Sequence, residues 1–197
     1  HGITAKECSS RNVLVVGVGE IGTQIVRLCR GLNMNVQGCD LERRLEGLSY
    51  VDLQTGLRNS DVIFCSLPLD DSTRSLLDYD CLKTLTSQPL LINISRGEIT
   101  PFEDMVKLLK RKVLSGLSMD VYPQEDQLAH FLRNDAVDIS DTQKKVFARL
   151  KEFSQKDNVL FTPHNAFNTA EALYRKSQLS WDSLHHFIQT GQFPNQL

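Results

Sequence analysis

NVLVVGVGEIG, at residues 12–22, is the stretch of this sequence that decides the fold. Its first part, 12–17, is short, rich in valine and largely apolar, which is typical of a strand buried on both faces of a parallel sheet. From Ile21 to Leu32 the apolar residues then recur at helical spacing. The residues GVGEIG at 17–22 fit the pattern G-x-G-x-x-G. Because this pattern follows a strand and opens a helix, it predicts a dinucleotide-binding turn.

The glycine-rich turn gives each of its positions a physical role. Gly17 permits the tight turn, Gly19 lets the backbone approach a pyrophosphate, and Gly22 lets the helix pack closely on the strand. Glu20 and Ile21 stand in the first turn of the helix, where unpaired N–H groups and the positive end of the helix dipole favour phosphates. We therefore assign these five residues to a dinucleotide site. The alternative is a merely tight strand–helix turn.

A carboxylate at the end of the second predicted strand indicates which dinucleotide binds. Asp40 directly follows the strand at 35–39 and lies 18 residues after Gly22. A carboxylate there can accept hydrogen bonds from the adenosine ribose hydroxyls and repels a 2′-phosphate, which favours NAD over NADP. Arg43 and Arg44 follow closely enough to leave NADP open.

The order of the predicted elements indicates the fold class. Short apolar runs alternate with segments of helical spacing along the chain. This alternation predicts an α/β fold with a doubly wound parallel sheet of the Rossmann type, joined by right-handed crossovers. The predicted strands are 12–17, 35–39, 61–67, 90–94, 118–122 and 159–162. The predicted helices are 21–32, 53–58, 78–85, 101–110 and one that starts near Thr169, with Asn168 and Glu171 as its capping pair and Gly191 at its end.

The stretch 124–157 does not follow this alternation. It is long, charged and helical in pattern, and Ser140 with Gln143 predicts a helix cap inside it. Such an insertion is either a packed decoration, or it shapes access to a site or a subunit contact. The expected organisation is a leader or linker at 1–11, a domain at 12–191 with a helical insertion at about 126–157, and a C-terminal tail at 192–197.

Charge and composition exclude several classes of partner. The chain has 197 residues, with 22 Lys and Arg against 24 Asp and Glu, and a net charge of −2. That balance gives no reason to expect nucleic acid or an anionic membrane, and no apolar run approaches the roughly 18 residues of a membrane span. The five cysteines are odd in number and no two form C-x-x-C. We therefore expect small buried thiols in a reducing cytoplasm, without disulfides or a metal site.

Four further segments carry a resemblance to a known family. They are LPLDDSTRSLL at 67–77, LINISRGEI at 91–99, GLSMDVYPQE at 116–125 and NVLFTPHNAFNTAEA at 158–172. Together with the glycine-rich turn, and in this order, they resemble the nucleotide-binding domain of the D-isomer-specific 2-hydroxyacid dehydrogenases. The resemblance covers about 12–191. It implies a Rossmann-type domain that binds NAD and serves hydride transfer between NAD(H) and a small D-2-hydroxy acid or 2-keto acid.

The resemblance implies three catalytic residues. The family motif N-x-x-R-G falls on 93–97 and places the catalytic arginine at Arg96, the family glutamate falls on Glu125, and the histidine of T-P-H falls on His164. An arginine can bind a substrate carboxylate with two parallel hydrogen bonds and polarise the keto oxygen. A histidine titrates near neutrality and can serve as general acid and base, with a carboxylate to orient it. Taken singly, each residue is more simply read as a surface charge, a solvated loop acid or a structural histidine.

The resemblance also extends the cofactor site beyond the glycine-rich turn. Leu67 and Pro68 correspond to a loop that lies along the cofactor. Ile94 and Ser95 directly precede the arginine position and are assigned to the same site. Asp120 corresponds to a residue near the nicotinamide carboxamide. The expected partners are the 2-keto or 2-hydroxy acid and a second copy of the chain, because the family usually forms homodimers through this domain.

Two differences from the family bear on function. Family members carry a second domain for the substrate, mostly before the glycine-rich turn, whereas only 16 residues precede Gly17 here. We therefore expect a nucleotide-binding domain that is incomplete for full activity. Many relatives have arginine where Glu20 stands, so this acid either weakens pyrophosphate binding slightly or faces solvent.

The alternative function is that of an NAD(H)-sensing, corepressor-like interaction protein. Some relatives with this domain act in transcriptional corepression and use bound NAD(H) to control self-association and partner docking. The fold alone does not separate such a sensor from an enzyme. A dependence of dimerisation on NADH would favour the sensor, and turnover of a keto acid would favour the enzyme.

Overall fold

The computed structural model describes residues 7–135 and 138–194. The chain divides into two compact units, and the boundary lies between Pro163 and His164. The first unit contains the whole sheet, and the second contains one long helix.

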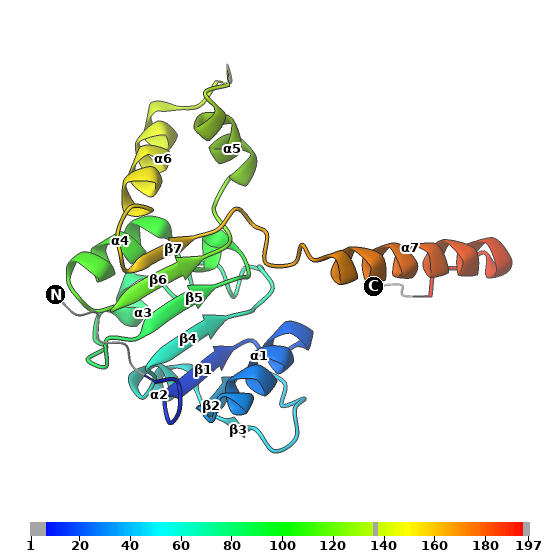
Figure 1. The fold of residues 1–197 in the computed structure, drawn as a ribbon, viewed down its shortest axis with the longest axis horizontal. Coiled ribbons are helices and arrows are strands. Elements are labelled where there is room, and N and C mark those ends of the chain that lie inside the picture. Colours follow the sequence, from blue (N-terminus) through cyan, green and yellow to red (C-terminus); the bar gives the residue numbers. More distant parts are fainter. Residues whose placement is uncertain (1–6, 136–137, 195–197) are drawn as a thin grey trace. The chain divides into compact units, whose positions relative to one another are not determined.

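The first unit is built on a seven-stranded sheet in which all neighbouring strands are parallel (Figure 1). The strand order is β3-β2-β1-β4-β5-β6-β7. The strands are β1 Asn12–Val16, β2 Asn35–Cys39, β3 Ser49–Tyr50, β4 Val62–Cys65, β5 Leu90–Asn93, β6 Gly116–Met119 and β7 Val159–Phe161. The predicted α/β fold with a parallel sheet is confirmed.

Helices connect the strands. They are α1 Glu20–Gly31, α2 Leu53–Arg58, α3 Tyr79–Leu82, α4 Phe102–Lys110, α5 Glu125–Arg133 and α6 Asp141–Phe153. Helix α1 is packed on one face of the sheet, and α2, α3, α4 and α6 contribute to the core on the other. Side chains alternate along a strand, so β1 contributes to two cores. Val13 and Val15 pack with Val26 of α1. Leu14 belongs to the larger core on the other face, together with Leu57 of α2.

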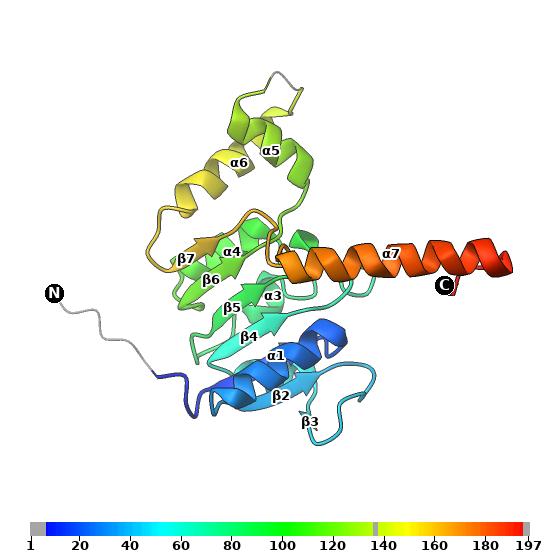
Figure 2. The same cartoon turned by 45° about the vertical axis from the view of Figure 1, so that its right-hand side comes forward.

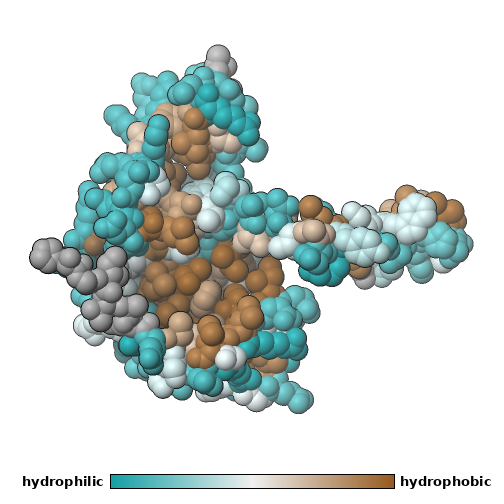
Figure 3. Space-filling view, viewed as in Figure 1, coloured by the Kyte–Doolittle hydropathy of each residue, from teal (hydrophilic) through white to brown (hydrophobic). Residues whose placement is uncertain are grey.

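Several apolar side chains line the α1 side of strands β4–β7. The register of the sheet places Val62, Phe64, Leu90, Ile92 and Leu160 there. The first four are only partly buried, and Leu160 is 60% exposed. Helices α3, α4 and α6 contribute instead to the core on the opposite side. Figure 3 shows the resulting broad apolar area on this side of the sheet.

The stretch 124–157 forms the helices α5 and α6. Ser140 caps α6 in a full capping box with Gln143, as the sequence predicts. Phe147 is 1% exposed and its ring lies 5.6 Å from that of Phe131, between ring centroids. The inner face of α6 therefore joins the larger core of the sheet, and its first turn is fixed by a local cap.

Several local features differ from the sequence predictions. Strand β6 begins at Gly116 and ends at Met119, because its ladder with β5 ends at the pair Asn93–Met119; the residues up to Tyr122 form a loop. Strand β3 was not expected, since two residues carry no periodic pattern. The cap of the last helix is not Asn168 but the next residue, as the second unit shows.

The second unit consists of the segment from His164 and the helix α7, Ala170–Thr190 (Figure 2). Thr169 caps this helix, because its hydroxyl accepts the N–H of Ala172 at 3.1 Å. Gly191 ends it in the left-handed conformation, as predicted. None of the side chains of α7 is buried.

Candidate cofactor and active site

The carboxyl ends of the parallel strands bring most of the predicted site residues of the first unit to one edge of the sheet. Strand β1 leads into the glycine-rich turn, β2 leads to Asp40, β5 leads to Ile94, and β6 leads to Asp120. Strands β1 and β4 are neighbours, and the chain proceeds from them in opposite directions across the sheet. Ligands of open α/β sheets bind in the crevice at such a switch point.

The glycine-rich turn is too crowded for side chains at two positions. A Cβ on Gly17 would lie 2.7 Å from the carbonyl oxygen of Ser66, and this glycine also has a φ of +91°. A Cβ on Gly22 would lie 2.0 Å from the carbonyl oxygen of Gly17. Both neighbours are backbone atoms, so the turn closes only with glycine at both positions.

The middle of the turn is open. A Cβ on Gly19 would meet nothing within 4 Å. In a dinucleotide-binding turn the pyrophosphate approaches the backbone at this position, and a side chain there would fill the space. Glu20 and Ile21 follow as the first residues of α1, and both are exposed. Their N–H groups belong to the first turn, which has no preceding helical carbonyl to bond, so the turn fits a pyrophosphate group.

Asp40 holds the turn from the side of β2. Its Oδ2 accepts the N–H of Val18 at 2.6 Å, and its Oδ1 accepts the N–H of Glu42 at 3.0 Å. Each carboxylate oxygen can accept a second hydrogen bond, so ribose hydroxyls can still bind. Arg44 forms an ion pair with Glu42 at 2.6 Å, which offsets the positive charge that could attract a 2′-phosphate.

The residues after β4 and β5 lie on the other side of the switch point. Leu67 is partly buried, and the carbonyl of the exposed Pro68 accepts the hydroxyl of Thr73 at 2.7 Å. Ile94 packs against the core on the α1 side. Ser95 is 7% exposed, and its hydroxyl contacts the thiol of Cys65 at 3.4 Å. Burial raises the pKa of the Cys65 thiol, which keeps it protonated.

Asn93 holds the loop that carries Arg96. The amide nitrogen of this fully buried asparagine donates to the carbonyl of Arg96 at 2.9 Å and to the hydroxyl of Thr100 at 2.7 Å. Its Oδ1 accepts the N–H of Ser95 at 2.9 Å. The guanidinium of Arg96 donates to the Ser95 carbonyl at 2.7 Å and is exposed. The motif N-x-x-R-G therefore has a physical basis, because the asparagine shapes the turn that presents the arginine.

The loop of Arg96 lies against the loop of Glu125. A Cβ on Gly97 would lie 2.4 Å from the carbonyl carbon of Tyr122, so the two backbones touch. Glu125 accepts the N–H of Tyr122 at 2.9 Å through Oε1. The Tyr122 hydroxyl lies 2.9 Å from the carbonyl oxygen of Met119 and 3.0 Å from that of Thr162, and it can donate a hydrogen bond to either. Burial raises the pKa of this phenol well above its usual value, so it stays a donor.

The last two predicted residues lie in different units. Asp120 is 4% exposed, and its Oδ1 accepts the hydroxyl of Thr162 at 2.6 Å. His164 opens the second unit with a φ of +51°, and its ring lies edge-on to Phe167 with 5.9 Å between centroids. The pairing of His164 with Glu125 therefore stays a prediction.

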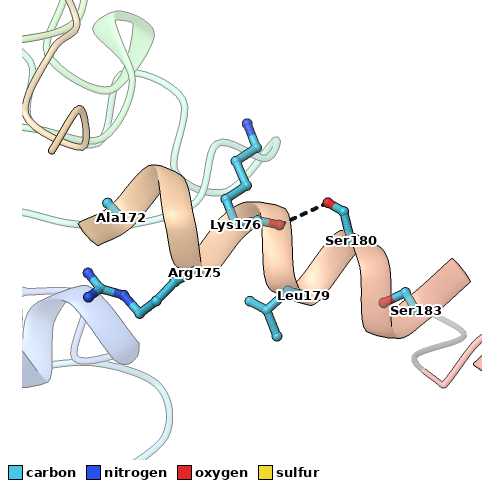
Figure 4. A pocket seen from close by; sticks show the side chains of 6 residues that line it. All are labelled: Ala172, Arg175, Lys176, Leu179, Ser180 and Ser183. Carbon is cyan, nitrogen blue, oxygen red and sulfur yellow. Dashed lines mark hydrogen bonds between the residues drawn. The ribbon is translucent and has the colours of Figure 1, made fainter. Parts of the chain in front are cut away.

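A shallow hollow lies along α7 in the second unit (Figure 4). Its lining residues are Ala172, Arg175, Lys176, Leu179, Ser180 and Ser183. All of them belong to a single helix, and none is a predicted site residue.

Sequence reasoning missed two residues of the site. Ser66 contacts the glycine-rich turn from the end of β4, and Asn93 was matched only as a member of a motif. Ser66 could have been found from the sequence, because it is a polar residue directly after a buried apolar strand. Asn93 stands inside a strand that the sequence predicts to be buried, and a buried amide requires hydrogen-bond partners.

A parallel sheet with a glycine-rich turn and an acidic second strand end at its switch point defines a dinucleotide-binding domain. Residues 1–166 match the family model described as "D-isomer specific 2-hydroxyacid dehydrogenase, NAD binding domain". The chain therefore belongs to the D-isomer-specific 2-hydroxyacid dehydrogenase family, as its NAD-binding domain, and its cofactor is NAD.

Individual relatives agree with this assignment. D-lactate dehydrogenase of Escherichia coli K12 is 34% identical over 100% of this chain and 59% of its own length. D-lactate dehydrogenase of Lactiplantibacillus plantarum is 30% identical over 98% of this chain and 57% of its own length. The crystal structure of D-lactate dehydrogenase from Aquifex aeolicus with NAD and lactic acid has a TM-score of 0.83 at 26% identity, and covers 98% of this chain and 59% of that one. The chain thus spans less than two thirds of these relatives.

No helix among residues 7–135 and 138–194 is long and apolar enough to cross a membrane. In the same part of the chain, no group of three or more His, Cys, Asp or Glu side chains could hold a metal ion.

The glycine-rich turn gives the first prediction, because its glycines differ in their surroundings. Gly19→Ala should leave the free energy of unfolding nearly unchanged and lower the affinity for NADH at least about tenfold, since the methyl fills the pyrophosphate space. Gly22→Ala should lower the free energy of unfolding by about 3 kcal/mol, because its methyl overlaps a backbone carbonyl. Urea unfolding and calorimetric titration of the variants measure the two effects.

Gly31→Ala is the matched control. This glycine stands at the end of the same helix and has nothing within 4 Å of its Cβ position, so neither quantity should fall. NADH binding by Gly19→Ala at the unsubstituted affinity would contradict the assignment of the open space.

Proposed function

We propose that this chain is the cofactor-binding part of an NAD-dependent D-2-hydroxyacid dehydrogenase. The enzyme transfers hydride between NAD(H) and a small D-2-hydroxy acid or 2-keto acid. The observation that carries the proposal is the backbone contact between Gly97 and Tyr122, which joins the loops of Arg96 and Glu125. Both loops follow strands that end at the same edge of the sheet as the glycine-rich turn.

The residues of this chain would divide the work of the reaction. Bound NADH supplies the hydride, and the protein supplies positioning and a proton. Arg96 would bind the substrate carboxylate with two parallel hydrogen bonds and polarise the keto oxygen. His164 would donate the proton to that oxygen, and Glu125 would orient the imidazole and favour its charged form. Asp120 would bind near the nicotinamide carboxamide.

The proposed activity needs more than this chain contains. The relatives named D-lactate dehydrogenase are matched over only 59% and 57% of their lengths. A second domain that closes over the substrate excludes water and completes such a site. We therefore propose that the full reaction takes place in a longer protein that includes this domain. The corepressor alternative has no supporting observation in this chain.

We also propose a homodimer that forms through α1. Ile21, Leu28 and Leu32 recur on one side of this helix and its end, and they are 60%, 70% and 55% exposed. A stripe of large exposed apolar residues on a helix is typical of a subunit contact. The five cysteines are free thiols, which supports a cytoplasmic location.

The dimer proposal predicts the effect of one charge. Leu28→Glu places a carboxylate in the proposed contact and should convert the dimer of the full-length protein to a monomer in analytical ultracentrifugation. Leu41→Glu is the control, because Leu41 is fully exposed in a loop and its replacement should leave the dimer intact. A monomeric unsubstituted protein would reject the proposal.

Calorimetric titration with NADH and NADPH tests the cofactor preference. The unsubstituted chain should bind NADH more tightly. Asp40→Ala removes the acceptor for the ribose hydroxyls and the acceptor of the Val18 N–H. It should therefore weaken NADH binding about tenfold and reduce the ratio of NADH affinity to NADPH affinity. Asp61→Ala is the matched control: its carboxylate also accepts a backbone N–H, that of Asn12, but at the opposite end of the sheet. An unaltered preference in Asp40→Ala would remove this residue from the ribose site.

Steady-state reduction of a panel of 2-keto acids by the full-length protein tests the catalytic role of His164. His164→Ala should lower kcat about 10²–10⁴-fold with only a modest loss of NADH affinity, as expected for a lost proton donor. His186→Ala, on the exposed surface of α7, should leave kcat unchanged. If His164→Ala retained full turnover, the residue would have no part in proton transfer.

A further inference from the structure

The peptide unit between Gly17 and Val18 is held by side chains at both ends. The Ser66 hydroxyl donates to the Gly17 carbonyl at 2.7 Å. The Asp40 carboxylate accepts the Val18 N–H at 2.6 Å. Ser66 follows β4 and Asp40 follows β2, which lie on either side of β1. A rotation of this peptide plane would therefore break both hydrogen bonds.

Ser66 is itself fixed, so it can hold the turn in one position. Its N–H donates to the carbonyl of Val16 at 2.8 Å, which extends the pairing of β4 with β1 by one residue. Its backbone blocks the Cβ position of Gly17, with the carbonyl oxygen at 2.7 Å and the carbonyl carbon at 2.8 Å. Its hydroxyl oxygen lies 3.1 Å from the Cβ position of Gly22. The side chain thus stands between the first and last glycines of the turn.

The orientation of this peptide unit decides where the following N–H groups point. The chain turns at Gly17 from the strand into α1, and Gly19 to Ile21 come directly after the clamped unit. These are the residues whose backbone faces the pyrophosphate space. A preorganised turn binds an anion without first losing conformational freedom, so holding the peptide plane favours binding.

We propose that Ser66 is a positioning residue for the NAD site: its hydroxyl fixes the Gly17 carbonyl and thereby presents the backbone of the turn to the diphosphate of the cofactor. Asp40 holds the opposite end of the same peptide unit. The inference rests on NAD binding by this domain and adds the residue that follows β4 to the site. It predicts that Ser66 acts on the diphosphate and not on the adenosine.

Calorimetry with the 197-residue chain separates these contributions. Ser66→Ala should weaken the binding of NADH and of ADP about fivefold to tenfold, the usual effect of one lost hydrogen bond, and leave adenosine binding unchanged. Ser66→Cys nearly keeps the size of the side chain, but its thiol is only a weak hydrogen-bond donor. This variant should therefore also bind NADH and ADP more weakly than the unsubstituted chain. Unchanged NADH affinity in either variant would overturn the proposal.

Ser60→Ala provides the matched control. Ser60 is 3% exposed and donates to the carbonyl of Gly56 at 2.7 Å, away from the turn, so its removal costs a comparable hydrogen bond. It should lower the melting temperature and leave NADH affinity unchanged. Equal losses of NADH affinity in the Ser60 and Ser66 variants, or an equal loss of adenosine binding in Ser66→Ala, would show a general loosening and reject the positioning role. Failure of the unsubstituted chain to bind NADH would reject the proposed function itself.

Discussion

The close approach of two backbones, at Gly17 and Gly22, is the constraint on which the rest of the site depends. The Gly17 carbonyl occupies the space that a side chain on Gly22 would need, so α1 begins directly against the end of β1. That contact fixes the start of the helix over the switch point of the sheet. The open space at Gly19 and the bond from Asp40 to the turn both follow from it.

Local patterns in the sequence were sufficient for most of the fold. The strand before the glycine-rich turn, the helix after it and the short helix at 53–58 are where their apolar spacing predicts them. The acidic residue after the second strand also lies where the motif requires. These features depend on neighbours within a few residues of one another, or on strand ends that a parallel sheet brings together. The parallel arrangement of the strands followed from the alternation of elements and the hand of crossovers.

The rest depends on contacts between distant residues, which periodicity does not reveal. Ser66 meets a carbonyl 49 residues away, and the Tyr122 hydroxyl reaches a carbonyl 40 residues away. The two-residue strand β3 exists only because β2 offers it a partner. The cap of α7 is Thr169, one residue after the expected Asn168. Asparagine and threonine are both good N-cap residues, so the residue types alone do not determine at which of two adjacent positions a helix begins.

The crowding at the glycines has a genetic consequence. At Gly22 and Gly97 an added methyl would meet backbone atoms, at 2.0 and 2.4 Å, and no second substitution can remove a backbone atom. At Gly56 the obstacle is the side chain of Leu14, at 2.5 Å, which a smaller residue could replace. Defects at the first two positions are thus beyond second-site suppression by a neighbouring side chain, whereas a defect at Gly56 is open to it. The domain therefore tolerates substitution least where backbone atoms occupy the space of a side chain.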